Sequence, residues 1–141
     1  MVGLLRVSRA LLPPLRRPPG GHLVNIGSIA GFDVYPGGGG YAASKHAVRA
    51  ITATLRMELN GEPVRVSEID PGMTETEFSL VRYDGDADKA AEVYTGMRPL
   101  SADDVADCVE WVVTRPAHVN VDQLVVRSVD QATATLVARR R

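Results

Sequence analysis

The chain has 141 residues, of which 45% are hydrophobic and 23% are charged, which is ordinary for one soluble globular domain with a moderate core. The formal net charge of -1 gives no reason to expect nucleic acid or an anionic membrane as a partner, and no apolar run reaches the ~18 residues of a membrane span. The single cysteine, Cys108, leaves no internal disulfide and favours a cytoplasmic location.

Residues 1–15 are predicted to form an amphipathic helix, because leucines recur along one side of it. Arg6 and Arg9 interrupt the apolar stretch that a targeting peptide needs. A strand follows at residues 22–28, "HLVNIGS", whose almost unbroken apolar character is typical of a strand buried on both faces.

The next segment, "YPGGGG" at residues 35–40, is predicted to be a loop. Residues 41–60 carry apolar side chains at helical spacing, and Gly61 follows where a helix end favours a left-handed residue. A second strand is predicted at residues 64–70, "VRVSEID". The long segment 77–99 is predicted to be an insertion that covers a ligand site.

A third helix is predicted to begin at Ser101, which forms a capping box with Asp104, and to stop before Pro116. A third strand is predicted at residues 122–129, "DQLVVRSV". Alternation of helices and strands predicts an α/β fold with a parallel sheet, right-handed crossovers and helices on both faces.

Several chemically useful residues follow the carboxyl ends of these strands, where parallel sheets bind ligands. Ser28 ends the first strand, the pair Pro71 and Gly72 ends the second, and Tyr41 and Lys45 open the helix between them. Read alone, Tyr41 and Lys45 are a solvated surface pair and Ser28 is a cap at a strand end. Their predicted convergence on one edge favours a catalytic site instead.

Three stretches, "GHLVNIGSIAG", "YAASK" and "VRVSEIDPGMTET", together resemble the classical short-chain dehydrogenase/reductase family in order and spacing. The resemblance covers the chain but only the C-terminal half of a usual member. It implies the C-terminal part of a doubly wound, Rossmann-type parallel sheet with about three strands and flanking helices. It also implies an oxidoreductase that transfers a hydride between a nicotinamide cofactor and a substrate carbon.

The resemblance assigns Tyr41 as the catalytic acid/base, whose pKa near 10 in free solution needs a neighbouring charge to be useful. Lys45, one helical turn later, supplies that positive charge. Both are also expected to contact the cofactor, Lys45 at the nicotinamide ribose. Ser28 is expected to hold the substrate oxygen.

Four further residues are expected to bind the cofactor. Pro71 and Gly72 let the backbone approach the nicotinamide. Thr76 is expected to meet the carboxamide, while Thr74 stands where the family usually has valine and would contribute its backbone.

The amino-acid sequence of residues 77–99 and of the following segment resembles the branch of the family that contains NADP-dependent 3-hydroxy acid and serine dehydrogenases. It implies a small hydroxy acid or semialdehyde as substrate and NADP as cofactor, with NAD not excluded because the selecting residue is absent. Arg82 is then a candidate for the substrate carboxylate, and a solvated loop arginine is the alternative. Epimerase and dehydratase relatives share the Tyr-x-x-x-Lys motif but lack the Pro-Gly-x-x-x-Thr run that follows the second strand here.

The Gly-rich turn that binds the cofactor pyrophosphate in this family does not occur in residues 1–141. We therefore expect a single, partial NAD(P)-binding domain. It is a piece of a longer enzyme, an inactive pseudoenzyme, or a shortened chain that associates with full-length relatives. Helices 1–15 and 41–60 match those that family members pack against a second subunit, so a homo-oligomer is expected.

The remaining candidate residues carry no catalytic prediction. The three histidines lack the spacing of a metal site or a catalytic triad, and Cys108 lies on an apolar stripe, so it is predicted to belong to the core. No metal is expected. The histidines are His22, His46 and His118.

Overall fold

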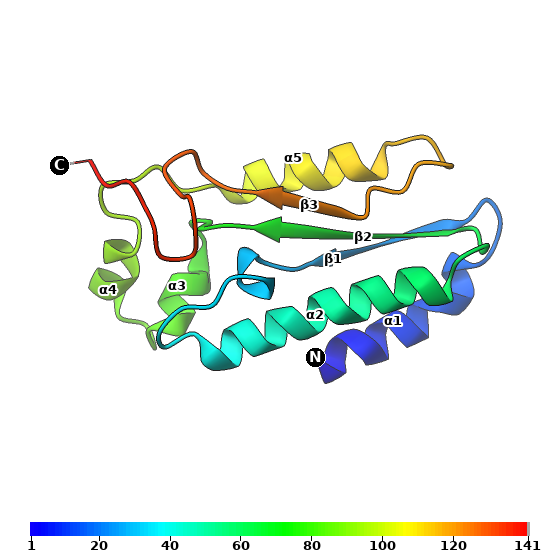
Figure 1. Ribbon diagram of the computed structural model, residues 1–141, viewed down its shortest axis with the longest axis horizontal. Coiled ribbons are helices and arrows are strands. Elements are labelled where there is room, and N and C mark those ends of the chain that lie inside the picture. The colour runs from blue at the N-terminus through cyan, green and yellow to red at the C-terminus, as the bar shows by residue number, and fades with distance from the viewer. Residues whose placement is uncertain (141) are drawn as a thin grey trace.

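The computed structural model describes residues 1–140, which contain one parallel sheet (Figure 1). Its strands lie in the order β1, β2, β3. Glu68 on β2 pairs with Asn25 on β1 and with Gln123 on β3, so the carboxyl ends of the strands meet at one edge. The predicted α/β class with a parallel sheet is confirmed. The strands are β1 (Gly21–Ile26), β2 (Val64–Pro71) and β3 (Gln123–Val126).

The helices pack around this sheet: α1 contacts β1, α2 contacts β2 and η1, and α5 contacts β2. Within residues 1–140, no helix is both long and apolar enough to cross a membrane. The helical elements are α1 (Val2–Leu15), the 3-10 helix η1 (Ile29–Gly31), α2 (Gly39–Glu58), α3 (Glu77–Arg82), α4 (Ala87–Glu92) and α5 (Ala102–Val113).

The core is centred on β2, where every residue of the run 66–70 is buried. Because neighbouring side chains on a strand point to opposite faces, both faces of β2 must be covered. Ile69 and Val112 of α5 are fully buried there. By contrast, β1 pairs with a strand on one side only within the described residues, and Ile26 at its end is 48% exposed.

The helix predicted at residues 41–60 is observed as α2, which begins and ends two residues earlier than predicted. The loop predicted at residues 35–40 is therefore wrong at Gly39 and Gly40. Glycine is unfavourable mainly in the middle of a helix, whereas Gly39 and Gly40 stand in the first turn, directly after the N-cap residue Gly38. Gly61 has a φ of 87° and follows the helix end as predicted. The capping box of Ser101 and Asp104 is confirmed at the start of α5.

Two predicted strands are shorter than expected. β1 stops at Ile26 because the next residues turn away, with Ser28 capping η1. The third strand starts only at Gln123 and ends at Val126. Segment 77–99 is not a plain loop, since it contains α3 and α4, each with a side-chain cap. Cys108 is half-buried, so its assignment to the core holds only in part.

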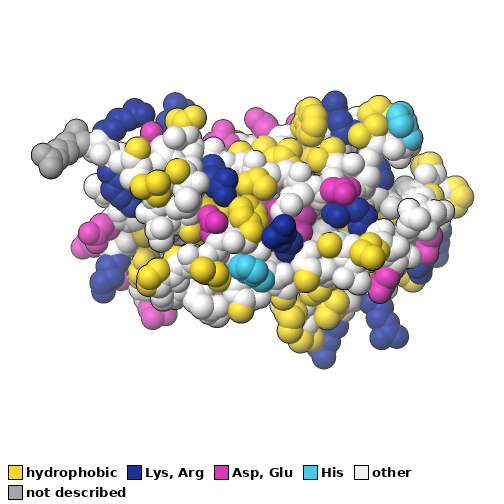
Figure 2. Space-filling view, viewed as in Figure 1, with side chains coloured by type: hydrophobic (Ala, Val, Ile, Leu, Met, Phe, Trp, Pro, Cys, Tyr) yellow, Lys and Arg dark blue, Asp and Glu magenta, His cyan; other side chains and the backbone are white. Residues whose placement is uncertain are grey.

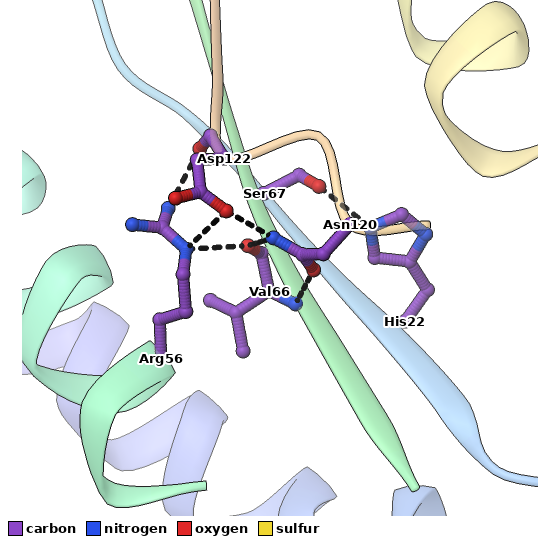
Figure 3. Close-up of polar contacts among 6 residues, drawn as sticks. All are labelled: His22, Arg56, Val66, Ser67, Asn120 and Asp122. Carbon is purple, nitrogen blue, oxygen red and sulfur yellow. Dashed lines mark hydrogen bonds and ion pairs between the residues drawn. The ribbon is translucent and has the colours of Figure 1, made fainter. Parts of the chain in front are cut away.

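Asn120 substitutes for a strand next to β2 before β3 begins (Figure 3). Its Oδ1 accepts a hydrogen bond from the Val66 amide at 2.8 Å, and its Nδ2 donates to the Val66 carbonyl at 3.0 Å. Arg56 of α2 donates to the same carbonyl at 3.1 Å and pairs with Asp122. The amino end of β2 is therefore fastened to α2 and to the segment before β3, far along the strand from its carboxyl edge.

Candidate active site

A cavity of about 560 Å³ opens at the carboxyl edge of the sheet, a size that is usual for small-ligand sites. It is bordered by the ends of β1 and β2, the first turns of α2, the α3 region and the C-terminal segment. The structure brings all the sequence-predicted site residues to its wall. They are Ser28, Tyr41, Lys45, Pro71, Gly72, Thr74, Thr76 and Arg82.

Ser28 is fixed by hydrogen bonds at both its backbone and its side chain. Its amide donates to Asp70 Oδ1 at 2.8 Å, and its Oγ accepts from the Ala30 amide at 3.1 Å. It therefore does cap η1, as the simpler reading of the sequence holds, while also lining the cavity. Its hydroxyl hydrogen is left to serve a ligand oxygen.

Tyr41 and Lys45 lie one turn apart on α2 and face the same cavity. The Lys45 Nζ lies 5.8 Å from the centre of the Tyr41 ring and donates to the Ile26 carbonyl at 3.0 Å. Burial lowers the pKa of Lys45, and the carboxyl groups of Asp70 and Glu68 oppose this shift. On its other side, the Tyr41 ring packs against Phe78 with centroids 5.3 Å apart.

The backbone after β2 is held by Gln131, a residue that the sequence analysis missed. Gln131 Oε1 accepts a hydrogen bond from the Met73 amide at 2.8 Å, and Gln131 is only 4% exposed. A Cβ at Gly72 would stand 2.2 Å from Gln131 Oε1, so a larger residue there would force Gln131 to shift away from the Met73 amide. For Gln131, the only signal in the sequence was its position after the third strand, at the same edge of the sheet.

Thr74 and Thr76 use their hydroxyl groups locally. Thr74 Oγ1 donates to the Gly72 carbonyl at 3.2 Å, while Thr76 Oγ1 accepts from the Phe78 amide at 3.3 Å and caps α3. The Thr74 carbonyl accepts from the Tyr94 hydroxyl at 2.9 Å. These bonds tie the cavity floor to the segment that covers it.

Arg82 is exposed to solvent at the end of α3, and it also contacts Tyr35 across the cavity. Its Nη1 donates to the Tyr35 hydroxyl at 3.1 Å, and its guanidinium lies 5.5 Å from the centre of the Tyr35 ring. Both residues line the cavity. The guanidinium keeps further donors that can meet an anion.

The segment 127–140 forms one wall of the site and was also missed. The Ala134 amide donates to Asp33 Oδ2 at 3.1 Å, and Arg127 lies 3.8 Å from the same carboxylate. Farther along, the Arg140 amide donates to the Gly96 carbonyl at 2.7 Å. This segment, which we call the C-terminal strap, thus joins the η1 region to the region after α4.

Within residues 1–140, no group of three or more histidine, cysteine, aspartate or glutamate side chains is arranged to hold a metal ion. His22 forms a hydrogen bond with Ser67 Oγ at 2.7 Å, near the amino end of β1 and away from the carboxyl edge that borders the cavity. Burial, with Asp107 and Asp104 nearby, raises the pKa of the Cys108 thiol, which makes it a poor nucleophile.

The family model described as short chain dehydrogenase matches residues 1–85. The chain belongs to the short chain dehydrogenase family. The chain is 56% identical over 135 residues to an uncharacterized oxidoreductase of Mycobacterium tuberculosis, covering 96% of this chain and 54% of that protein. It is 44% identical over 140 residues to an NADP-dependent 3-hydroxy acid dehydrogenase of Escherichia coli, covering 99% of this chain and 56% of that protein.

The same dehydrogenase fold is seen in a solved structure, the closed form of a serine dehydrogenase complexed with NADP+. The TM-score is 0.91 at 44% identity, over 99% of this chain and 56% of that one. A serine dehydrogenase from Escherichia coli matches with a TM-score of 0.74 at 37% identity, over 92% of this chain and 50% of that one. The chain therefore spans about half the length of the relatives it matches.

Proposed function

We propose that this chain carries the catalytic side of an NADP-dependent dehydrogenase that oxidises the 3-hydroxyl of a small hydroxy acid, or reduces the corresponding semialdehyde. The observation that carries the proposal is the meeting of Ser28, Tyr41 and Lys45 on one cavity. The names of the 44%-identical relatives support the cofactor and the substrate class.

Tyr41 is the proposed acid/base at the substrate oxygen. The neighbouring ammonium of Lys45 favours the ionised phenol, because an opposite charge nearby stabilises the charged form. Ser28 is held rigidly by Asp70 and Ala30, so its hydroxyl can orient the substrate oxygen without reorganisation. In the oxidation direction, Tyr41 accepts the hydroxyl proton.

The residues present fit the nicotinamide end of the cofactor. NADP, when bound, supplies the hydride acceptor or donor. Gly72 leaves the cavity wall bare of a side chain, and the backbone there is fixed by Gln131. We propose that Pro71, Gly72 and the Thr74 backbone line the ring, that Thr76 meets the carboxamide, and that Lys45 and Tyr41 contact the ribose. NAD instead of NADP is an alternative.

We propose Arg82 as the group that meets the substrate carboxylate. It lines the cavity and already donates to a neutral oxygen, the Tyr35 hydroxyl. A carboxylate is a stronger acceptor than a phenol, and its two oxygens suit the guanidinium fork.

A second candidate function is association without catalysis. The open edge of β1 and the exposed apolar side chains of α1 favour it, since both are surfaces that pair with another chain. Figure 2 shows hydrophobic side chains gathered over α1. The exposed apolar residues of α1 include Val2, Leu5, Val7 and Leu11. We propose that the chain forms a homo-oligomer through residues 1–15 and 41–60.

We also propose that residues 1–141 act as one partial NAD(P)-binding domain, and that the protein is located in the cytoplasm.

Nicotinamide mononucleotide tests the proposal, because it is the half of the cofactor that this cavity is proposed to hold. We expect its addition to shift the amide resonances of Gly72 and Thr76 in spectra of the ¹⁵N-labelled chain. Lys45→Met should weaken binding about tenfold, the size expected for one charge-assisted hydrogen bond. Lys89→Met, on the exposed surface of α4, is the matched control. Shifts that avoid the cavity, or an equal loss in the control, would refute the proposal.

A further inference from the structure

Two buried carboxyl groups lie beneath the cavity, and only the contact of one of them, Asp70, with the Ser28 amide has been used so far. Glu68 is 2% exposed and Asp70 is 0% exposed. They are two residues apart on β2, so their side chains point to the same face of the strand. Buried acids are rare unless a partner compensates them, so their partners require an account.

Gly27 brings the two groups together. A Cβ added to Gly27 would stand 2.1 Å from Asp70 Oδ1 and 2.4 Å from Glu68 Oε1. Both oxygens therefore lie close to the α-carbon of Gly27. The close approach also explains why glycine occupies position 27, in the sequence "NIGS", since any side chain there would displace the carboxyl groups.

The two carboxyl groups are not equally satisfied. Asp70 Oδ1 accepts from the Ser28 amide at 2.8 Å, and its Oδ2 accepts from Gln123 Nε2 at 2.6 Å. Glu68 Oε1 is buried without a hydrogen-bond partner. An unpartnered, buried carboxylate oxygen beside a second carboxylate is unfavourable twice over, through desolvation and through repulsion. A proton on Glu68 removes the repulsion and the part of the desolvation cost that is due to charge.

The charged groups that face the pair come from α2. Burial and the charge of Asp70 raise the pKa of Glu68 to about 7, and Thr52 and Arg49 act in the opposite direction. Lys45 also faces the pair, and its Nζ donates to the Ile26 carbonyl, one residue before Gly27. The carboxyl pair thus supplies negative charge that acts on the Lys45 ammonium.

We propose that Glu68 and Asp70 share one proton and act as a positioning pair, with Asp70 holding the Ser28 amide and the remaining negative charge stabilising the Lys45 ammonium. The pairing itself stands on the packing around Gly27. Its value to catalysis rests on the proposed function.

A carboxyl titration tests the pair in the chain itself, without any measurement of activity. With ¹³C-labelled side-chain carboxyls, we expect one glutamate resonance to titrate at least one pH unit above ordinary glutamates. The Ser28 amide resonance should follow the same midpoint, because its proton is donated to Asp70. A buried acid with a merely structural role would leave that amide unchanged near neutral pH.

Two variants show which residue gives rise to the high-pH titration. Glu68→Gln should abolish the high titration and the matching change at Ser28, whereas the control Glu110→Gln, on the exposed side of α5, should leave both in place. If all carboxyls titrate below about pH 5.5, or if the Ser28 amide does not follow, the pair does not exist. The wild-type titration decides the matter even if Glu68→Gln does not fold. Failure to bind nicotinamide mononucleotide would leave this result unaffected.

Discussion

At the scale of single residues, His22 shows how burial sets a protonation state away from the active site. Burial, together with the charge of Arg65, lowers the pKa of His22 to about 4. Its Nδ1 has no partner, and its Nε2 meets Ser67 Oγ (Figure 3). The folded chain therefore holds a neutral imidazole that cannot be protonated without loss of stability.

The sign of the pH dependence follows from this lowered pKa. The unfolded chain binds a proton at His22 below about pH 6.5 and the folded chain does not, so stability falls as pH drops from 6.5 towards 4. We expect His22→Gln to remove about 1–3 kcal/mol of this loss. The measurement is the urea midpoint at pH 8 and at pH 4.5. His118→Gln is the control, and an equal effect of both variants would contradict the prediction.

At the scale of elements, the start of α5 is a self-contained device whose strength can be measured. Ser101 Oγ accepts from the Asp104 amide at 3.1 Å, and the Asp104 carboxylate accepts from the Ser101 amide at 2.7 Å. We expect Ser101→Ala to lower the free energy of unfolding, measured by urea denaturation, by about 1 kcal/mol. Ser101→Asp should retain most of the wild-type stability, because aspartate also supplies an acceptor. If Ser101→Asp loses as much stability as Ser101→Ala, the effect comes from packing and not from capping.

The elements also show what the sequence could predict. Repeating apolar positions and caps are local, so α2 and α5 were predicted to within about two residues, and the Tyr41–Lys45 spacing followed from the helix. The bracing of Met73 by Gln131 joins residues 58 positions apart. No local pattern encodes such a contact. The end of β1 was misplaced for the same reason, since it depends on Asp70.

At the scale of the whole molecule, the open surfaces lead to a prediction about behaviour in solution. β1 has an unpaired edge within residues 1–140, and α1 exposes apolar side chains. We expect the purified chain to elute as an oligomer or aggregate in size-exclusion chromatography with light scattering.

We also expect no measurable NADPH oxidation with a semialdehyde, since only the nicotinamide end of the cofactor has proposed contacts. A monomer that turns over NADPH, and loses turnover on Tyr41→Phe, would overturn this prediction and support the site.

The C-terminal strap has a consequence for how the protein is made. The hydrogen bond between Ala134, which lines the cavity, and Asp33 joins residues 101 positions apart in the chain. During translation, Tyr41 and Lys45 are therefore synthesised long before the residues that complete their surroundings. Until the strap has left the ribosome, the nascent cavity has a floor but lacks a wall, and ligand recognition has to wait for it.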